Sequence, residues 1–289
     1  MIILIGVFIV FATVLGGFMM GGGHIGSLMH LSEFIVIGGA ALGALVIMAP
    51  KKVLIDLVKL MILAFKGAPY NRDAYQELLK ALYELFLLGR RNGMIALEEH
   101  VMKPEASSIF QKYPSFAKNH HALAFLCGGL RPIIDGKIKP DQLKVLMDVE
   151  MEAMEHEHEA PISVLTKSAD AMPGFGIVAA VLGIVITMAA ISGPIEEIGH
   201  KVAAALVGTF LGIFISYGLM NPLAVNMEFV CGMEMAYTRC IASSVIGFAN
   251  GMAPLMAVEV ARRGLASDVR PSADDLEAML KALNSPPKG

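Results

Sequence analysis

The four most apolar stretches of this 289-residue chain contain no aspartate, glutamate, lysine or arginine. They run Ile2–Met20, Phe34–Pro50, Ala171–Ile195 and Val202–Met227. A charge-free stretch of roughly 17 to 25 residues is what a helix needs to cross about 30 Å of hydrocarbon, so the sequence predicts a polytopic membrane protein. If such a protein moves ions, the titrating carboxylate has to come from a partner chain, because these stretches offer none.

Charged residues are also scarce in the chain as a whole. They make up 17% of the sequence, whereas 55% of the residues are hydrophobic and the mean hydropathy is +0.63. Soluble globular domains carry about 25% charged residues, so the composition excludes that class. The first apolar stretch lacks the basic segment and the small-residue cleavage site of a secretory signal, and we therefore expect it to be retained.

Signs of catalysis and of metal or cofactor binding are missing as well. The sequence has no G-x-S-x-G, Walker or H-E-x-x-H pattern. Its three cysteines, Cys127, Cys231 and Cys240, show no metal-ligand spacing. Histidine and glutamate alternate over 155–159, but neighbouring positions on a helix point about 100° apart and so indicate a solvated face. We expect neither enzymatic activity, nor a metal site, nor a cofactor.

The basic residues predict the orientation of the chain. Sixteen of the 23 lysines and arginines fall in 51–170 and six in 228–289, and Lys51 and Lys52 follow the second apolar stretch directly. Since basic residues accumulate on the cytoplasmic side, we expect both termini in the cytoplasm and the two short connections outside. The cysteines then face the cytoplasm, where thiols stay reduced.

These features predict an all-α membrane protein. Four transmembrane helices would carry a helical cytoplasmic domain, inserted between the second and third of them, and a cytoplasmic C-terminal tail. Apolar residues at helical spacing predict a helix over 73–91, and no run alternates with a period of two, so we expect no strands. The uncharged segment 241–258 is predicted to be a buried cytoplasmic helix, because a fifth span there would place Arg262 and Arg263 outside.

The sequence also predicts how the helices pack, which partner is excluded and where the domains begin and end. Small residues such as Gly176, Ala179 and Gly183 predict close packing of the third membrane helix. The sixteen acidic residues of 51–170 balance its sixteen basic ones, which argues against nucleic acid as a partner. The domains are 1–50, with membrane helices at about 2–20 and 34–50; the cytoplasmic domain 51–170; 171–227, with membrane helices at about 172–194 and 202–222; and the tail 228–289, with a short helix over 273–283.

Two stretches of the sequence resemble the paired membrane signatures of a known family. The first is Met172–Gly183, and the second is Val207–Ile213 with Tyr217-Gly218 and 221–224. Both are similar to the third and fourth membrane helices of the flagellar motor stator A subunits, the MotA family of the MotA/TolQ/ExbB proton channel superfamily. The run Arg90–Glu98 resembles the rotor-facing motif of the same family.

The resemblance implies a role and a set of partners. The chain would be a stator subunit of the bacterial inner membrane, with five copies around two copies of the B subunit, MotB, whose single membrane helix carries the ion-binding aspartate. Together they would conduct protons, the coupling ion, and convert proton-motive force into torque on the rotor protein FliG. Membrane lipid is a further expected partner, and nucleic acid is not.

The resemblance also implies an ion pathway along the partner helix. Thr209 is the leading candidate, because a hydroxyl both donates and accepts; the alternative is a bond back to a carbonyl of its own helix. Pro173 and Pro222 either bend their helices and free a carbonyl or merely end them. Tyr217 and Thr187 are the remaining polar candidates, although an aromatic residue near the membrane boundary also serves as an anchor.

Ala180 bears on the identity of the ion. In sodium-driven relatives the matching position is commonly threonine, whose oxygen suits a hard cation. A methyl group stands here, and a proton needs no coordination shell beyond a carboxylate, so this position favours proton coupling. The alternative is that Ala180 is only a small packing residue.

Charged residues outside the apolar stretches are the candidates for rotor contact. Arg90 and Glu98 match the family motif, with Arg91 as an ambiguous neighbour and Glu150 as a weaker candidate. On a continuous helix, eight residues correspond to about 12 Å of rise and about 80° of rotation, so Arg90 and Glu98 would share one broad face. The alternative is plain solvation, since exposed charges contribute little on their own.

Two other functions stay open at this point. One is an energiser of outer-membrane transport of the ExbB/TolQ type, although those relatives typically have three spans and an exterior amino terminus. The other is a secondary transporter, which would keep binding charges within its own spans. Glu33, at the outer edge of the second stretch, is expected in interfacial water, with a role at an ion entrance left open.

Overall fold

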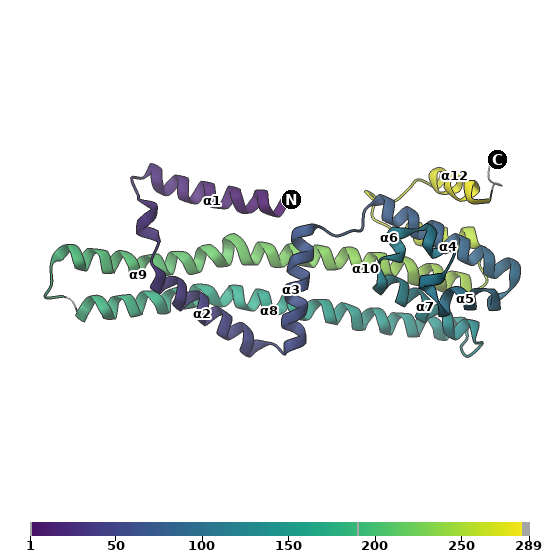
Figure 1. The fold of residues 1–289 in the computed structure, drawn as a ribbon, viewed down its shortest axis with the longest axis horizontal. Helices are drawn as coiled ribbons and strands as arrows, with labels where there is room; N and C mark the ends of the chain where they lie inside the picture. Colours follow the sequence, from purple (N-terminus) through teal and green to yellow (C-terminus); the bar gives the residue numbers. More distant parts are fainter. Residues whose placement is uncertain (1, 190, 285–289) are drawn as a thin grey trace. The chain divides into compact units, whose positions relative to one another are not determined.

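All regular structure in the described residues is helical. The computed structural model describes residues 2–189 and 191–284 and contains no strand within them, which confirms the all-α prediction. The helices are α1 (Ile2–Met20), α2 (Leu31–Met48), α3 (Lys51–Lys66), α4 (Arg72–Asn92), α5 (Glu98–Met102), α6 (Pro114–Ala117), α7 (His120–Ile134), α8 (Pro140–Ala189), α9 (Ile195–Ile215), α10 (Asn221–Ala249), α11 (Pro254–Arg263) and α12 (Ala273–Asn284) (Figure 1). Short 3₁₀ turns are η1 (Ile25–Leu28), η2 (Met94–Leu97), η3 (Pro104–Ala106) and η4 (Phe110–Lys112), and η5 (Ser216–Met220) is a π turn.

The helices form two compact units, each with its own hydrophobic core. The first contains the residues up to Gly67 together with Glu157–Val230, and the second contains Ala68–His156 together with the residues from Cys231 onward. The long helices α8 and α10 contribute residues to both units.

The first unit holds apolar helices that pack on one another through α2, α8 and α9. By length and composition, four helical stretches of the described residues could cross a membrane, and they lie within Ile2–Met20, Ile25–Met48, Pro140–Ala189 and Ile195–Ala249. Helix α1 buries none of its residues, so its apolar surface is free to meet lipid or another chain. The core residues are Ile37, Ala41, Met172, Ala179, Val207 and Leu211.

The second unit is built around α4. Asn71 caps this helix, since its side-chain oxygen accepts a hydrogen bond from the Ala74 backbone N–H at 2.9 Å. The inner face of α4 is fully buried, and Phe86 stacks on Phe248 with ring centroids 4.5 Å apart. At Gly89 an added Cβ would lie 2.9 Å from Leu97 Cδ1 and 3.0 Å from Phe248 Cζ, so α4, η2 and α10 meet tightly at this point.

Two glycines end helices that the sequence analysis treated as continuous. Gly93 has φ 85° and ends α4 at Asn92, so the helix predicted over 73–91 is confirmed, but Arg90 and Glu98 do not lie on one continuous helix. Gly251 also has φ 85°, and it separates α10 from α11, so the predicted single helix over 241–258 is wrong as well. Both glycines occupy the left-handed region that other residues rarely adopt, which is a common way for a helix to stop.

The two prolines of the family signatures lie in different settings. Helix α8 continues through Pro173, so the interpretation of that proline as a helix end is wrong. Proline is tolerated inside apolar helices because neighbouring groups and local adjustments satisfy the freed carbonyl. Pro222 is the second residue of α10 and follows the π turn η5, a distortion often found at functional sites.

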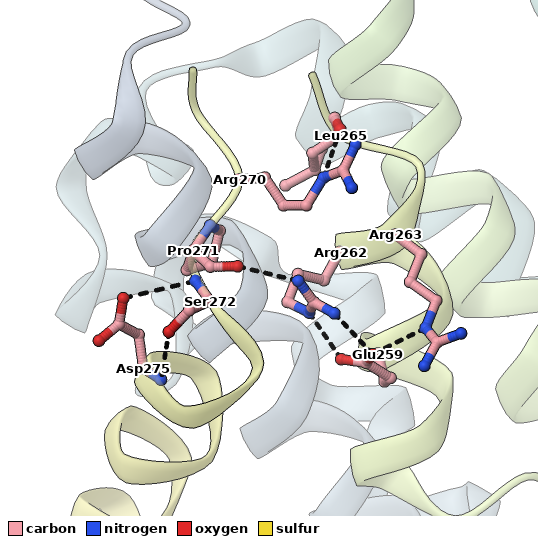
Figure 2. Close-up of polar contacts among 8 residues, drawn as sticks. All are labelled: Glu259, Arg262, Arg263, Leu265, Arg270, Pro271, Ser272 and Asp275. Atoms are coloured by element: carbon pink, nitrogen blue, oxygen red, sulfur yellow. Dashed lines mark hydrogen bonds and ion pairs between the residues drawn. The ribbon is translucent and has the colours of Figure 1, made fainter. Parts of the chain in front are cut away.

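An arginine cluster joins α11 to the segment that precedes α12 (Figure 2). The Arg262 side chain donates two hydrogen bonds to the Glu259 carboxylate, both at 2.7 Å, and a third to the Pro271 carbonyl at 2.9 Å. Arg263 donates to the same carboxylate at 2.9 Å. Arg262 is a buried charge, and its ion pair with Glu259 and three hydrogen bonds make this burial tolerable.

The same region caps the last helix. The Asp275 backbone N–H donates to the Ser272 hydroxyl at 3.0 Å, and Arg270 donates to the Leu265 carbonyl at 2.8 Å (Figure 2). Ser272 therefore acts as the N-cap of α12, as expected for serine before a helix. The predicted short helix over 273–283 is confirmed.

A glutamine in place of Glu259 is expected to destabilise the second unit in a pH-dependent way. Hydrogen bonds from Arg262 and Arg263 lower the pKa of the Glu259 carboxyl from 4.5 to about 2. A lowered pKa in the folded state means that the stabilisation is complete above pH 4.5 and is lost as pH falls toward 2; it amounts to about 3 kcal/mol. The free energy of unfolding is measured from pH 7 down to 3 for the wild type and E259Q. The difference between the two proteins should shrink as pH falls.

Glu277→Gln is the matched control, because the Glu277–Lys281 pair spans one helical turn on an exposed surface. It should cost less than about 0.5 kcal/mol. A constant difference between E259Q and the wild type over the whole pH range would contradict the assignment.

Candidate functional site

Three glycines bring α8 and α9 into backbone contact, and we call Gly176, Gly208 and Gly212 the glycine seam. A Cβ added at Gly176 would lie 2.8 Å from the Gly208 carbonyl oxygen, and one at Gly212 would lie 2.6 Å from the Met172 carbonyl oxygen. Since real Cβ atoms essentially never approach other heavy atoms so closely, only glycine fits at these positions. The predicted close packing through small residues is confirmed here.

Glu33 is buried against this seam. Only 6% of the Glu33 surface is exposed. Its Oε2 atom lies 2.7 Å from the position that a Cβ on Gly208 would occupy. Oε2 has no hydrogen-bond partner among the described residues, whereas Oε1 lies 3.5 Å from the Ser32 hydroxyl. The expectation that Glu33 stands in interfacial water is wrong, because it shares the buried face of α2 with Ile37 and Ala41.

The hydroxyls of the apolar helices fall into two groups. Thr187 donates back to the Gly183 carbonyl at 2.8 Å, so its hydroxyl is occupied within its own helix. Thr209 is half-buried on α9, and no hydrogen bond links its side chain to another group in the part of the chain that the structure describes. The alternative that the Thr209 hydroxyl bonds to a carbonyl of its own helix is therefore wrong. Ser216, at the start of the π turn, is fully buried, and its hydroxyl also lacks a partner there.

The predicted pathway residues are only partly brought together. The α8 backbone at Met172, beside Pro173, touches Gly212, and Thr209 Cα would lie 3.2 Å from a Cβ on Gly176. Pro173 and Thr209 thus flank the same seam.

The other pathway candidates lie away from this contact. Ala180 is half-buried on α8, next to the buried Ala179. Tyr217 is 62% exposed and Pro222 is exposed, so both are open to a second chain.

A hollow of about 520 Å³ lies at the start of α9, and we call it the outer hollow because the connection beside it is predicted to face outside. Two of its lining residues lie on or next to the helices that hold the buried carboxylate and the seam: His30 directly precedes α2, three residues before Glu33, and Ala204 lies on α9, four residues before Gly208. No sequence signal marked this hollow, because its walls come from segments far apart in the chain. It is lined by His30, Pro194, Glu196, Glu197, His200, Lys201 and Ala204.

The predicted rotor-contact residues surround the end of α4. Arg90 and Arg91 occupy its last turn, and Glu98 starts α5 beyond the Gly93 turn. All three are exposed, and no hydrogen bond or ion pair joins them to one another in the described residues. Glu150 is half-buried on α8, and in the same residues neither a hydrogen bond nor an ion pair connects it to this group.

Family comparisons identify the chain. The sequence model of the family Motility protein A N-terminal matches residues 4–93, and that of the MotA/TolQ/ExbB proton channel family matches residues 117–227. Motility protein A of Salmonella typhimurium is 38% identical over 286 residues, which cover 99% of this chain and 97% of that protein. The chain belongs to the motility protein A family. Its role is therefore that of a proton-conducting stator subunit of the flagellar motor.

Two further relatives agree with this assignment. Motility protein A of Escherichia coli is 36% identical over 99% of this chain and 97% of its own length, and the chemotaxis protein LafT of Vibrio parahaemolyticus is 36% identical over 96% and 97%. These matches select the stator over the ExbB/TolQ-type energiser and the secondary transporter.

Solved structures of stator complexes share the fold. The MotAB structure from C. jejuni superposes with a TM-score of 0.76 at 22% identity, covering 94% of this chain and 98% of that chain. The flagellar MotAB stator complex from Bacillus subtilis superposes with a TM-score of 0.73 at 26% identity, covering 95% and 98%. The motility protein A fold thus extends over almost the whole chain.

Proposed function

We propose that the chain forms, with a MotB-type partner, a proton channel of the bacterial inner membrane that converts proton-motive force into torque on the rotor. The observation that carries the proposal is a set of polar groups without partners in otherwise apolar helices: Glu33 Oε2 and the hydroxyls of Thr209 and Ser216. An unpaired buried polar group costs about 1–3 kcal/mol, so these groups favour a complex in which another chain or a proton satisfies them.

The proposed topology has four membrane spans, with both termini and the domain 51–170 in the cytoplasm. The four apolar helical stretches and the lysine pair after α2 support it. The proposed membrane segments are 1–50 and 171–227, and the tail 228–289 is cytoplasmic.

The proposed assembly has five copies of the chain around two partner chains. The solved structures that share the fold are MotAB complexes, which supports a partner of the MotB type. Exposed apolar residues also favour an assembly, because α1 buries none of its side chains within the single chain. Tyr217 and Pro222 are exposed on the helices proposed to face the partner.

The proposed proton path begins in the outer hollow and passes the buried Glu33 carboxylate. From there it continues along the glycine seam to Thr209, where an aspartate of the partner helix would accept the proton. A hydroxyl suits this position, because it both donates to a carboxylate and accepts from a carboxylic acid. Ala180 offers no oxygen to a metal cation, which favours a proton over sodium, and no enzymatic step or cofactor is needed.

Thr209→Val tests this path, since valine keeps the shape of threonine and removes the hydroxyl. Loss of a hydrogen bond to a charged group is expected to slow proton flow about tenfold, while Thr209→Ser retains most of it. Proton flow is measured as a pH change inside vesicles that contain the complex, and assembly by co-purification with the partner. Wild-type flow in T209V would remove Thr209 from the path, and flow that follows a sodium gradient would contradict proton coupling.

The proposed rotor contact uses Arg90, Arg91 and Glu98, with FliG as the partner and Glu150 as a secondary candidate. Opposite charges stand on the two sides of the Gly93 turn, so the surface offers both signs to a complementary partner. Complementary charges set the register and the rate of protein association.

Arg90→Glu and Glu98→Lys are each expected to remove most swimming speed without affecting membrane insertion or partner binding. Both side chains are exposed, so the changes alter surface charge and not packing. Lys118→Glu is the control, a charge reversal of the same size at an exposed position of the same unit. Normal swimming of both variants would contradict the rotor assignment.

A further inference from the structure

Helix α3 has two apolar faces, and only one of them is covered by the chain. Leu57, Leu60 and Ala64 are buried. A second apolar row points away from them by roughly 150° around the helix axis. We call this row the α3 stripe; it consists of Ile55, Val58, Ile62 and Phe65, which are 38–55% exposed.

Lysines run along the side of the stripe. Lys52, Lys59 and Lys66 are seven residues apart, a spacing that keeps them on one line with a drift of about 20° per step. That line lies roughly 60° to 100° from the α3 stripe. Lys51 stands at the start of the helix, so α3 carries four lysines and a single acidic residue, Asp56.

The pairing of these lysines leaves positive charge available. Lys52 contacts Glu157 at 2.7 Å and Lys59 contacts Asp56 at 3.3 Å. Neither Lys51 nor Lys66 has an ion pair within the residues that the structure describes.

Within the first unit, α3 runs in a different direction from the apolar helices. Helix α3 begins at Lys51, three residues after α2 ends at Met48. In Figure 1 its axis lies across the direction of α8 and α9. A helix that turns crosswise where an apolar helix ends is placed along a membrane surface. Val46 and Ile47, at the end of α2, are further exposed apolar side chains near the start of α3.

We propose that α3 is an in-plane helix that binds the headgroups of anionic phospholipids with its lysines while the α3 stripe enters the acyl-chain boundary. An apolar row flanked by lysines is the pattern of interfacial helices, and lysine stems extend along apolar surface to place the ammonium at headgroup level. The ligand is an anionic lipid because unpaired lysines near a membrane surface attract such headgroups. This inference rests on the proposed topology, which places α3 at the cytoplasmic leaflet.

A thiol label on the stripe makes the inference testable in the full complex. Ile62→Cys is introduced and labelled with a fluorophore; the native Cys127, Cys231 and Cys240 are buried and react little. The complex is placed in vesicles of equal parts phosphatidylglycerol and phosphatidylcholine, in which the acyl chains of one lipid or the other carry bromine, a short-range quencher. Ile95→Cys, at an exposed isoleucine of the second unit, is the control position.

Quenching at position 62 is expected from both lipids, with brominated phosphatidylglycerol at least about twofold more effective. Replacing Lys51, Lys59 and Lys66 together by glutamine should abolish the preference, and the label at position 95 should not be quenched. Absence of quenching by either lipid would overturn the inference, since water or a second copy of the chain would then cover the stripe. Equal quenching with the lysines intact would overturn headgroup binding. The assay requires neither proton flow nor a rotor, so its failure is separate from failure of the proposed function.

Discussion

Gly212→Ala is expected to abolish swimming, although alanine is the stronger helix former. The added Cβ would lie 2.6 Å from the Met172 carbonyl oxygen and 3.0 Å from Gly176 Cα. Both are backbone atoms, so no side chain can move aside, and α8 and α9 have to separate. Overpacking of this kind costs about 1–3 kcal/mol, and it also shifts Thr209 away from the position set by the glycine seam.

Gly199→Ala is the matched control for this variant. It lies on the same helix, and an added Cβ there meets nothing within 4 Å, so the gain of about 1 kcal/mol in helix propensity is the same at both positions. Swimming, co-purification with the partner and thermal unfolding of the complex are measured for both variants. If G212A swims as well as G199A, the close contact is not required for function.

Glu33→Gln is expected to lower proton flow about tenfold or more while leaving the complex assembled. Glutamine has nearly the same shape, so the packing against Gly208 is retained, but it cannot pass a proton on. A positioned acid or base typically contributes 10²–10⁴-fold to a proton-transfer step. The pH change inside vesicles is measured with and without an imposed proton gradient.

Glu196→Gln provides the comparison, because Glu196 lines the outer hollow but is exposed. A single exposed charge contributes little, so its flow should stay close to that of the wild type. Equal flow in E33Q and the wild type would assign Glu33 a packing role only.

The apolar helices could be predicted from the sequence because their signal is local. A stretch without charge and of sufficient length has few alternatives to a membrane helix, and α1 matches the predicted stretch 2–20. Small residues likewise predicted tight packing, although not which pairs meet. That depends on the rotation of each helix, which only the three-dimensional contact between Gly176 and Gly208 shows.

The wrong predictions share a physical cause: each depends on backbone geometry or on a distant segment, and a short stretch of sequence contains neither. Glycine both permits a helix and ends it, so Gly93 and Gly251 could be assigned as stops only from their positive φ. The burial of Glu33 depends on its contact with Gly208 of α9, 175 residues further along the chain. One local signal was present, since Glu33, Ile37 and Ala41 recur at intervals of four and therefore lie on one helical face.

The tight meeting of α4, η2 and α10 at Gly89 has a mechanical consequence for the motor. Arg90 adjoins Gly89, and Glu98 adjoins the fully buried Leu97, so each proposed rotor-contact charge is one residue from a point of close packing. If these charges contact the rotor as proposed, a force on either of them would act next to this packing, which includes the stacked rings of Phe86 and Phe248. Close-packed interiors have low compressibility and transmit strain, so a rotor contact at Arg90 and Glu98 would rest on a base that deforms little.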